Sequence, residues 1–257
     1  IIAGDSATSE QLEMIRQSLG LDQPLYVQFP VWLGQILSGD LGTSLISGVS
    51  VWSMISVRFG PTLALSTSII LFSILVAVPL GVIAAWRQGT LLDRSISAFS
   101  VLGFSMPVFV TAYLLVLAFS ITLGWLPVQG YRGPGEGMWP FLSRLILPTL
   151  ALSTAYIALI ARITRTSVLE VMGEDYIRTA RAKGLRERAV LARHGLRNAA
   201  VPIITVIGLG ITNLISGVVV TESVFNLPGL GRLVVEAVLA RDYPVIQGLI
   251  LLFSFIY

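Results

Sequence analysis

Long runs without a charged side chain dominate the hydrophobic pattern of this chain. Five of them follow one another: Pro61–Ala85, Ser95–Tyr131, Leu145–Ala161, Asn198–Thr221 and Tyr243–Tyr257. The first alone has 25 residues, and about 20 apolar residues are enough for a helix to cross the hydrocarbon core of a bilayer. The pattern therefore predicts an all-α, polytopic membrane helical bundle whose last span is cut short at Tyr257.

Proline and glycine predict where these spans begin and bend. Pro61 is expected at the start of its helix, where a missing backbone N–H does no harm. The run from Ser95 to Tyr131 is too long for one straight span. We therefore expect a helix kinked near Pro107, followed by a non-helical exit around Gly124 and Pro127.

Composition supports a membrane protein and excludes several other classes. Hydrophobic residues make up 54% of the 257 residues and charged residues only 12%, whereas soluble domains are about one quarter charged. The chain has no cysteine and a single histidine, His194. A disulfide framework, a thiolate metal site and a histidine cluster are thus excluded within this sequence.

The distribution of charge predicts the orientation of the spans. Between Arg162 and Arg197 there are nine basic and four acidic side chains, a net charge of +5, and such loops remain in the cytosol. Alternation then places residues 1–60, 125–144 and 222–243 outside. An external amino-terminal region implies a further span before Ile1, so we expect six spans in the full protein.

The predicted spans offer no site at which an ion gradient or ATP could act directly. Within the four complete runs, tyrosine is the sole ionisable residue type, whereas ion-driven carriers usually hold a titratable group at membrane depth. The chain also lacks a GxxxxGK[ST] phosphate loop. If transport is active, its energy must come from a separate chain.

The segment Glu174–Asn198, called the elbow below, carries seven of the 17 Lys and Arg residues. One short helix is predicted from Glu174 to Lys183, ended by Gly184. A second helix is predicted from Arg186 to Arg197, leading into the membrane at Pro202. The elbow is thus either a docking surface for another protein or a loop whose arginines merely follow the positive-inside bias.

The amino-acid sequence of the elbow resembles the EAA loop of binding-protein-dependent ABC permeases, in the segments YIRTARAKGL (176–185) and HGLRNA (194–199). It is similar to the dipeptide/oligopeptide/nickel import branch, and to the first permease of the pair. Further similar segments, in the order of the family, are LGLDQP (19–24), GDLGTS (39–44), PTL (61–63), SMPVF (105–109), GWLP (124–127), LPGLGRL (227–233) and RDYPVIQ (241–247). The general EAA pattern itself matches only at Ala180 and Gly184, because Arg178 and Thr179 replace its glutamate and first alanine.

The resemblance implies an ABC importer type I permease fold in two parts. Residues 1–60 would form an external region between the first and second spans. Residues 61–257 would form the transmembrane permease domain, including a cytosolic EAA-type coupling loop at 162–200. The implied function is a translocation path for peptides or related small solutes. Nickel, metal-chelate or glutathione import within the same branch remains an alternative, as does a passive channel.

The resemblance also implies partners and a location. An external substrate-binding protein, a second homologous permease and cytosolic ABC ATPases would complete the assembly in the lipid bilayer of a bacterial or archaeal plasma membrane. ATP and Mg²⁺ would bind the ATPases. The chain itself would be no enzyme and would carry no cofactor or metal, and it is not expected to bind nucleic acid.

By resemblance, the first elbow helix is the coupling helix seated on an ATPase. Small side chains at Thr179, Ala180 and Ala182 would let a partner backbone approach closely, and arginines would bind carboxylates. The predicted ATPase-coupling residues are Asp175, Tyr176, Arg178, Thr179, Ala180, Arg181, Ala182, Lys183 and Gly184.

Two further groups of candidates lie outside the elbow. Ser105, Pro107, Asn213 and Glu222 are candidates for the substrate pathway, although Asn213 also suits interhelical hydrogen bonding and Glu222 suits an ion pair with Arg232. Leu227, Pro228, Gly229 and Gly231 form either an external gate or a plain turn before a helix.

Overall fold

A computed structural model describes residues 22–257, apart from the side chain of Ile215. This part of the chain is helical, with one isolated antiparallel bridge between Thr43 and Ser50. The helices in chain order are α2 (Leu25–Leu37), α3 (Val51–Trp86), α4 (Leu91–Ser105), α5 (Val108–Leu115), α6 (Met138–Met172), α7 (Asp175–Ala182), α8 (Glu187–Ala189), α9 (Leu196–Val224), α10 (Leu230–Ala240) and α11 (Tyr243–Ile256). Two π-helical segments, Val116–Thr122 and Val190–Gly195, and one 3₁₀ turn, Pro134–Glu136, complete the set.

Three stretches of the described chain are long and apolar enough to cross a membrane. They are Val51–Trp86, Met138–Met172 and Glu187–Leu214. The pair Leu91–Ser105 and Val108–Thr122 would make a fourth span, but its two halves are bent by 106° at the break. Pro107 supplies this break, since it cannot donate the hydrogen bond that a continuous helix requires. The predicted kink is therefore confirmed, and it is a sharp corner.

Several helices are longer than the charge-free runs that predicted them. Pro61 lies inside α3, so its prediction as a helix start is wrong. The helix begins at Val51 because the apolar residues Val51 and Ile55, one turn apart, are both buried. Likewise α6 continues to Met172, so Arg162 and Arg165 lie on a helix, where the sequence placed the beginning of a loop.

The described chain divides into two compact units. One contains residues 61–231, and the other contains residues 232–257 together with the described part of 1–60. Residues 232–257, which the sequence groups with the permease domain, thus fall in one compact unit with residues 22–60, and the functional division into an external region and a permease domain stays a prediction. The first 21 residues of the predicted external region lie outside the described residues.

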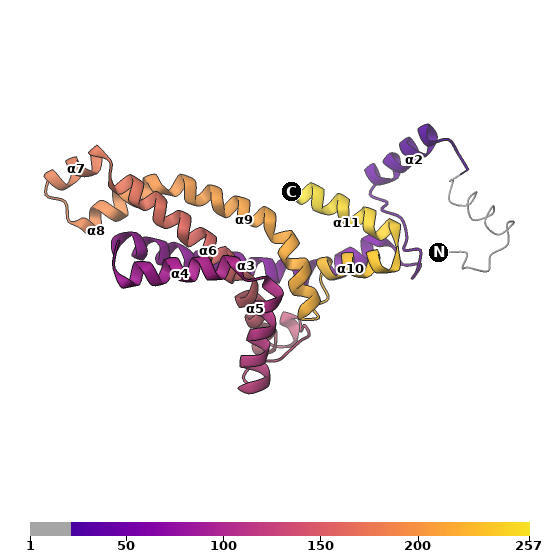
Figure 1. Cartoon of the computed structure of the whole chain (residues 1–257). Coiled ribbons are helices and arrows are strands. Elements are labelled where there is room, and N and C mark those ends of the chain that lie inside the picture. The colour runs from indigo at the N-terminus through magenta and orange to yellow at the C-terminus, as the bar shows by residue number, and fades with distance from the viewer. Residues whose placement is uncertain (1–21) are drawn as a thin grey trace. The chain divides into compact units, whose positions relative to one another are not determined.

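The core of the 61–231 unit is built mainly by α3, α5, α6 and α9. Leu65, Ile69, Leu152 and Leu214 are among its buried side chains. Figure 1 shows α6 and α9 running side by side and antiparallel, with α7 and α8 joining their ends. This layout places the elbow at the end of a helix pair.

The outer surface of the same unit is strongly apolar. Large side chains such as Leu75, Phe104, Ile121 and Val201 are more than 60% exposed. Apolar surface on this scale is unusual for a soluble monomer and is typical of contact with lipid or with another subunit. The surface therefore agrees with a bundle that lies within a bilayer.

Candidate functional site

The first helix of the elbow forms as the sequence predicted. Glu174 caps α7 in an extended conformation, and Asp175 stands in its first turn, where the helix dipole favours a negative charge. The helix ends at Ala182 and is followed by Gly184 at φ +78°. Only glycine adopts this left-handed conformation without steric cost, so the predicted stop at Gly184 is confirmed.

One face of α7 packs on the chain itself. Ile177 and Ala180 are buried against Val190, with Met172 alongside. Ala180 was predicted to let a partner backbone approach closely, but in this structure it is only 6% exposed. Ala180 therefore contributes to the packing of α7 on Val190, and a coupling role for it stays a prediction.

Two polar contacts tie α7 to the elements that follow it. The side-chain amide of Asn198, in the first turn of α9, donates to the Tyr176 hydroxyl at 2.9 Å. Arg181 donates to both carboxylate oxygens of Glu187 at 2.7 and 3.3 Å, which joins the end of α7 to α8. Together with the apolar contact, these bonds fix α7 relative to the start of α9.

The second predicted elbow helix, Arg186–Arg197, is not a separate helix. The short α8 passes through a π-helical segment into α9 without a break. Gly195 keeps right-handed dihedral angles of φ −70° and ψ −64°, so the helical backbone continues through it. A displacement of the elbow can therefore pass along one continuous helical path into the membrane.

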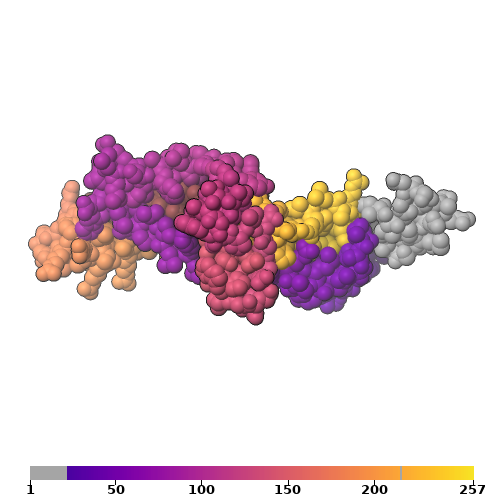
Figure 2. All heavy atoms as spheres, turned by 90° about the horizontal axis from the view of Figure 1, so that it is seen from below, coloured from indigo at the N-terminus to yellow at the C-terminus, as the bar shows by residue number. Residues whose placement is uncertain are grey.

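The opposite face of α7 is open and charged. Asp175, Arg178, Thr179, Ala182 and Lys183 are all exposed, and Figure 2 shows the elbow, in pale orange, protruding at the end of its unit. An ion pair joins Arg178 to Asp175 at 3.3 Å, but both side chains are largely exposed, so the pair adds little stability. Arg178 and Lys183 remain accessible to carboxylates of another protein.

The structure separates the pathway candidates. Ser105 ends α4 and donates to the Val101 carbonyl, and Pro107 caps α5 at the corner between the two helices. Asn213 is exposed in the middle of α9. Glu222 is completely buried and accepts a hydrogen bond from the Thr62 hydroxyl at 2.6 Å. A pathway role for these residues stays a prediction.

The segment 227–231 is a tightly held turn between α9 and α10. Asn226 has φ +53°, and the Leu227 amide donates to the Glu222 carbonyl at 2.9 Å. The Leu230 amide donates to the Thr62 hydroxyl at 2.7 Å. Thr62 thus links Glu222 to the start of α10. This geometry is that of a turn leading into a helix, and the gate role stays a prediction.

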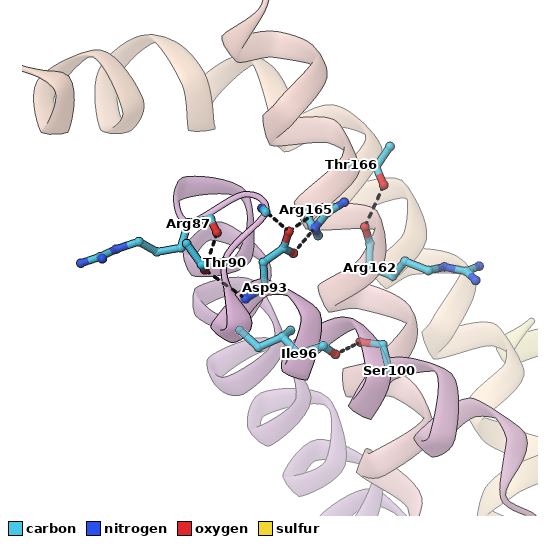
Figure 3. Close-up of polar contacts among 9 residues, drawn as sticks. Arg87, Thr90, Asp93, Ile96, Ser100, Arg162, Arg165 and Thr166 are labelled. Carbon is cyan, nitrogen blue, oxygen red and sulfur yellow. Dashed lines mark hydrogen bonds and ion pairs between the residues drawn. The ribbon is translucent and has the colours of Figure 1, made fainter.

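Sequence reasoning missed an ion pair between α4 and α6. The Arg165 guanidinium donates to the two carboxylate oxygens of Asp93 at 2.5 and 2.8 Å, and the Gly89 amide donates to Asp93 at 2.9 Å (Figure 3). The Asp93 side chain is only 5% exposed. A signal was present, because Asp93 is the only acidic residue between Asp40 and Glu136. An isolated acid at the beginning of an apolar run needs a partner.

Comparisons with known proteins show the family to which this sequence belongs. Residues 77–257 match the family described as binding-protein-dependent transport system inner membrane component, and residues 1–66 match its amino-terminal model. A probable peptide ABC transporter permease of Sinorhizobium fredii is 51% identical over the whole chain, which covers 82% of that protein. The glutathione transport system permease protein GsiC of Escherichia coli is 45% identical over 99% of this chain and 80% of that protein.

Solved structures show the same fold at low sequence identity. The inward-facing MetNI methionine ABC transporter matches 76% of this chain and 88% of its own, with a TM-score of 0.59 and 19% identity. An amino acid ABC transporter solved with histidines matches 88% and 91%, with a TM-score of 0.58 and 14% identity. The all-α permease fold and the multi-pass membrane character expected from the sequence are confirmed. The chain belongs to the family of binding-protein-dependent transport system inner membrane components, and it is a transmembrane permease subunit of an ABC transporter.

Proposed function

We propose that this permease forms part of an ATP-driven importer and that the open face of α7 seats on a cytosolic ATPase. The proposal rests on the difference between the two faces of α7. One face of α7 is fixed to the chain, and the other presents Arg178, Thr179, Ala182 and Lys183 to solvent. ATP and Mg²⁺ bind on the partner ATPases, and this chain needs no cofactor of its own.

The contacts of α7 explain how ATP-driven motion would reach the membrane. A push on α7 passes through the Asn198–Tyr176 hydrogen bond to the first turn of α9, and through the buried Ile177 to Val190 in the π-helical segment that leads into α9. Because α9 packs on α6 throughout the core, a rigid displacement of its end changes the opening of the bundle. With a second permease moving in the same way, the spans would alternate between inward-facing and outward-facing states.

The remaining parts of the proposal follow from the family. An external binding protein would deliver the substrate, and the assembly would lie in the plasma membrane of a bacterium or archaeon. Peptides are the proposed substrates, because a relative at 51% identity is named as a probable peptide permease. Glutathione, itself a small peptide, is the second candidate, because GsiC is 45% identical.

Exposed alanines of the elbow allow a matched test of coupling. Ala182 lies on the open face of α7, and Ala189 on α8 is also exposed. Ala182→Trp should prevent co-purification of the ATPase and abolish ATP-dependent uptake, because the indole ring keeps the partner backbone away. Ala189→Trp should preserve both. Ala180 is unsuitable for this test, since a large side chain there would disrupt the packing on Val190.

Retention of the ATPase and of normal uptake by Ala182→Trp would exclude α7 as the docking element. Uptake that continues in proteoliposomes without ATP would instead indicate a passive channel. The substrate class is tested separately, by competition between a labelled dipeptide and unlabelled glutathione or a nickel chelate in proteoliposomes that contain the binding protein. Failure of every peptide to compete would contradict peptide import while leaving the coupling proposal intact.

A further inference from the structure

A groove on the surface between α4 and α6 combines basic and apolar lining. It has a volume of about 300 Å³ and is lined by Ile96, Ser97, Val101, Ala161, Arg162 and Arg165, among others. The two arginines supply the basic part of this lining, and Ile96, Val101 and Ala161 supply apolar surface. Such a lining suits a ligand with an anionic head and a hydrocarbon tail.

The two arginines differ in their contacts: Arg165 is held in an ion pair, whereas Arg162 is available to bind a ligand. Arg165 directs Nε and Nη2 at Asp93, which neutralises most of its charge and leaves Nη1 for another acceptor. Arg162 forms no ion pair with any described residue, and Figure 3 shows its side chain pointing away from Asp93. Arg162, Arg165 and the Asp93 paired with Arg165 together carry one net positive charge.

The position of the groove along the helices suits the boundary between hydrocarbon and headgroups. Arg162 directly follows the apolar run that ends at Ala161, and Asp93 lies two positions before the charge-free run that begins at Ser95. The same end of α6 leads into the basic elbow, whose charge predicts a cytosolic location. The inner leaflet is the one that presents anionic headgroups to such a site.

We propose that this groove binds one anionic phospholipid. The Arg162 guanidinium would hold the headgroup phosphate through two parallel hydrogen bonds, and an acyl chain would lie along Ile96 and Val101. This site lies apart from the coupling face of α7. Its occupancy would stiffen the contact between α4 and α6 at the cytosolic end of the bundle.

Lipid retention by the assembled transporter tests the proposal. The complex is placed in nanodiscs with equal amounts of phosphatidylglycerol and phosphatidylcholine, extracted into detergent, and the lipid that remains bound is measured by mass spectrometry. We expect phosphatidylglycerol to be enriched, and Arg162→Gln to lower that enrichment by about fivefold. Arg162→Lys should retain part of it, because lysine keeps the charge but loses the planar fork.

Arg94 provides the matched control. It is exposed on α4 at a similar distance from the apolar run but does not line the groove. Arg94→Gln removes the same charge and should leave the enrichment unchanged. An equal loss in both variants, or no loss in Arg162→Gln, would overturn the proposal. Release of the lipid by millimolar inorganic phosphate would show a general anion site and would also overturn it.

Discussion

At the scale of single residues, a buried carboxylate controls the turn after α9. The side chain of Glu222 is completely buried, and it lies so close to Gly229 that a Cβ added there would come within 2.0 Å of a carboxylate oxygen. No side chain larger than hydrogen fits at Gly229 without displacing Glu222. The sequence contains both residues, but only the structure shows that the Glu222 carboxylate occupies the space beside Gly229.

Gly229→Ala is therefore expected to destabilise the protein by about 1–3 kcal/mol, the usual range for overpacking a filled site. The measurement is the thermal unfolding midpoint of the purified permease complex. Gly133→Ala is the control, because an added Cβ there meets nothing within 4 Å and the backbone has φ −71°. Equal midpoints for the two variants would show that Glu222 moves away freely.

At the scale of elements, α7 depends on its neighbours in the elbow for its stability and its position. It is only eight residues long, which is too short for an isolated helix to be stable in water. Its position depends on Ile177, on the Arg181–Glu187 pair and on the bond between Tyr176 and Asn198. The last of these is the direct polar link between α7 and α9.

Tyr176→Phe removes that link while keeping the ring. We expect ATPase binding to persist while substrate uptake per ATP hydrolysed falls severalfold, because α7 would move without displacing α9 to the same extent. Uptake and ATPase rates in proteoliposomes give this ratio. Asn198→Ala should reproduce the defect, and the double variant should be no worse than either single one. An additive double variant would contradict the link.

At the scale of the whole molecule, buried charge joins helices that are far apart in the sequence. Asp93 on α4 and Arg165 on α6 are separated by 72 positions, and α4 has few other polar contacts with α6 among the described residues. Removing one partner leaves the other as an unpaired charge in a region with little water. The pair therefore fixes how the bent segment α4–α5 sits on the bundle.

Asp93→Ala is expected to lower stability by on the order of 3 kcal/mol, because Arg165 loses a largely desolvated partner. Glu187→Ala breaks the exposed pair with Arg181 and should lower it by less than about 1 kcal/mol. The two midpoints of thermal unfolding in the same detergent provide the comparison. A smaller loss for Asp93→Ala than for Glu187→Ala would show that water reaches the α4–α6 site.

The sequence alone determined the helical class, the membrane location of the apolar runs, the short helix of the elbow and its stop at Gly184. These features depend on local properties: the length of an apolar run, the charge beside it and the freedom of one glycine. The permease family was also indicated by short sequence segments that resemble those of the family and occur in the same order.

Only the tertiary structure decided which face of α7 is open, how Arg165 is neutralised and why Gly229 must be glycine. It also showed that α3 begins before Pro61 and that α6 continues to Met172. Each of these depends on contacts between residues distant in sequence, such as Asp93 with Arg165 or Thr62 with Glu222. The periodicity of a single helix gives the spacing of its side chains, but the neighbouring helix decides which of them are covered.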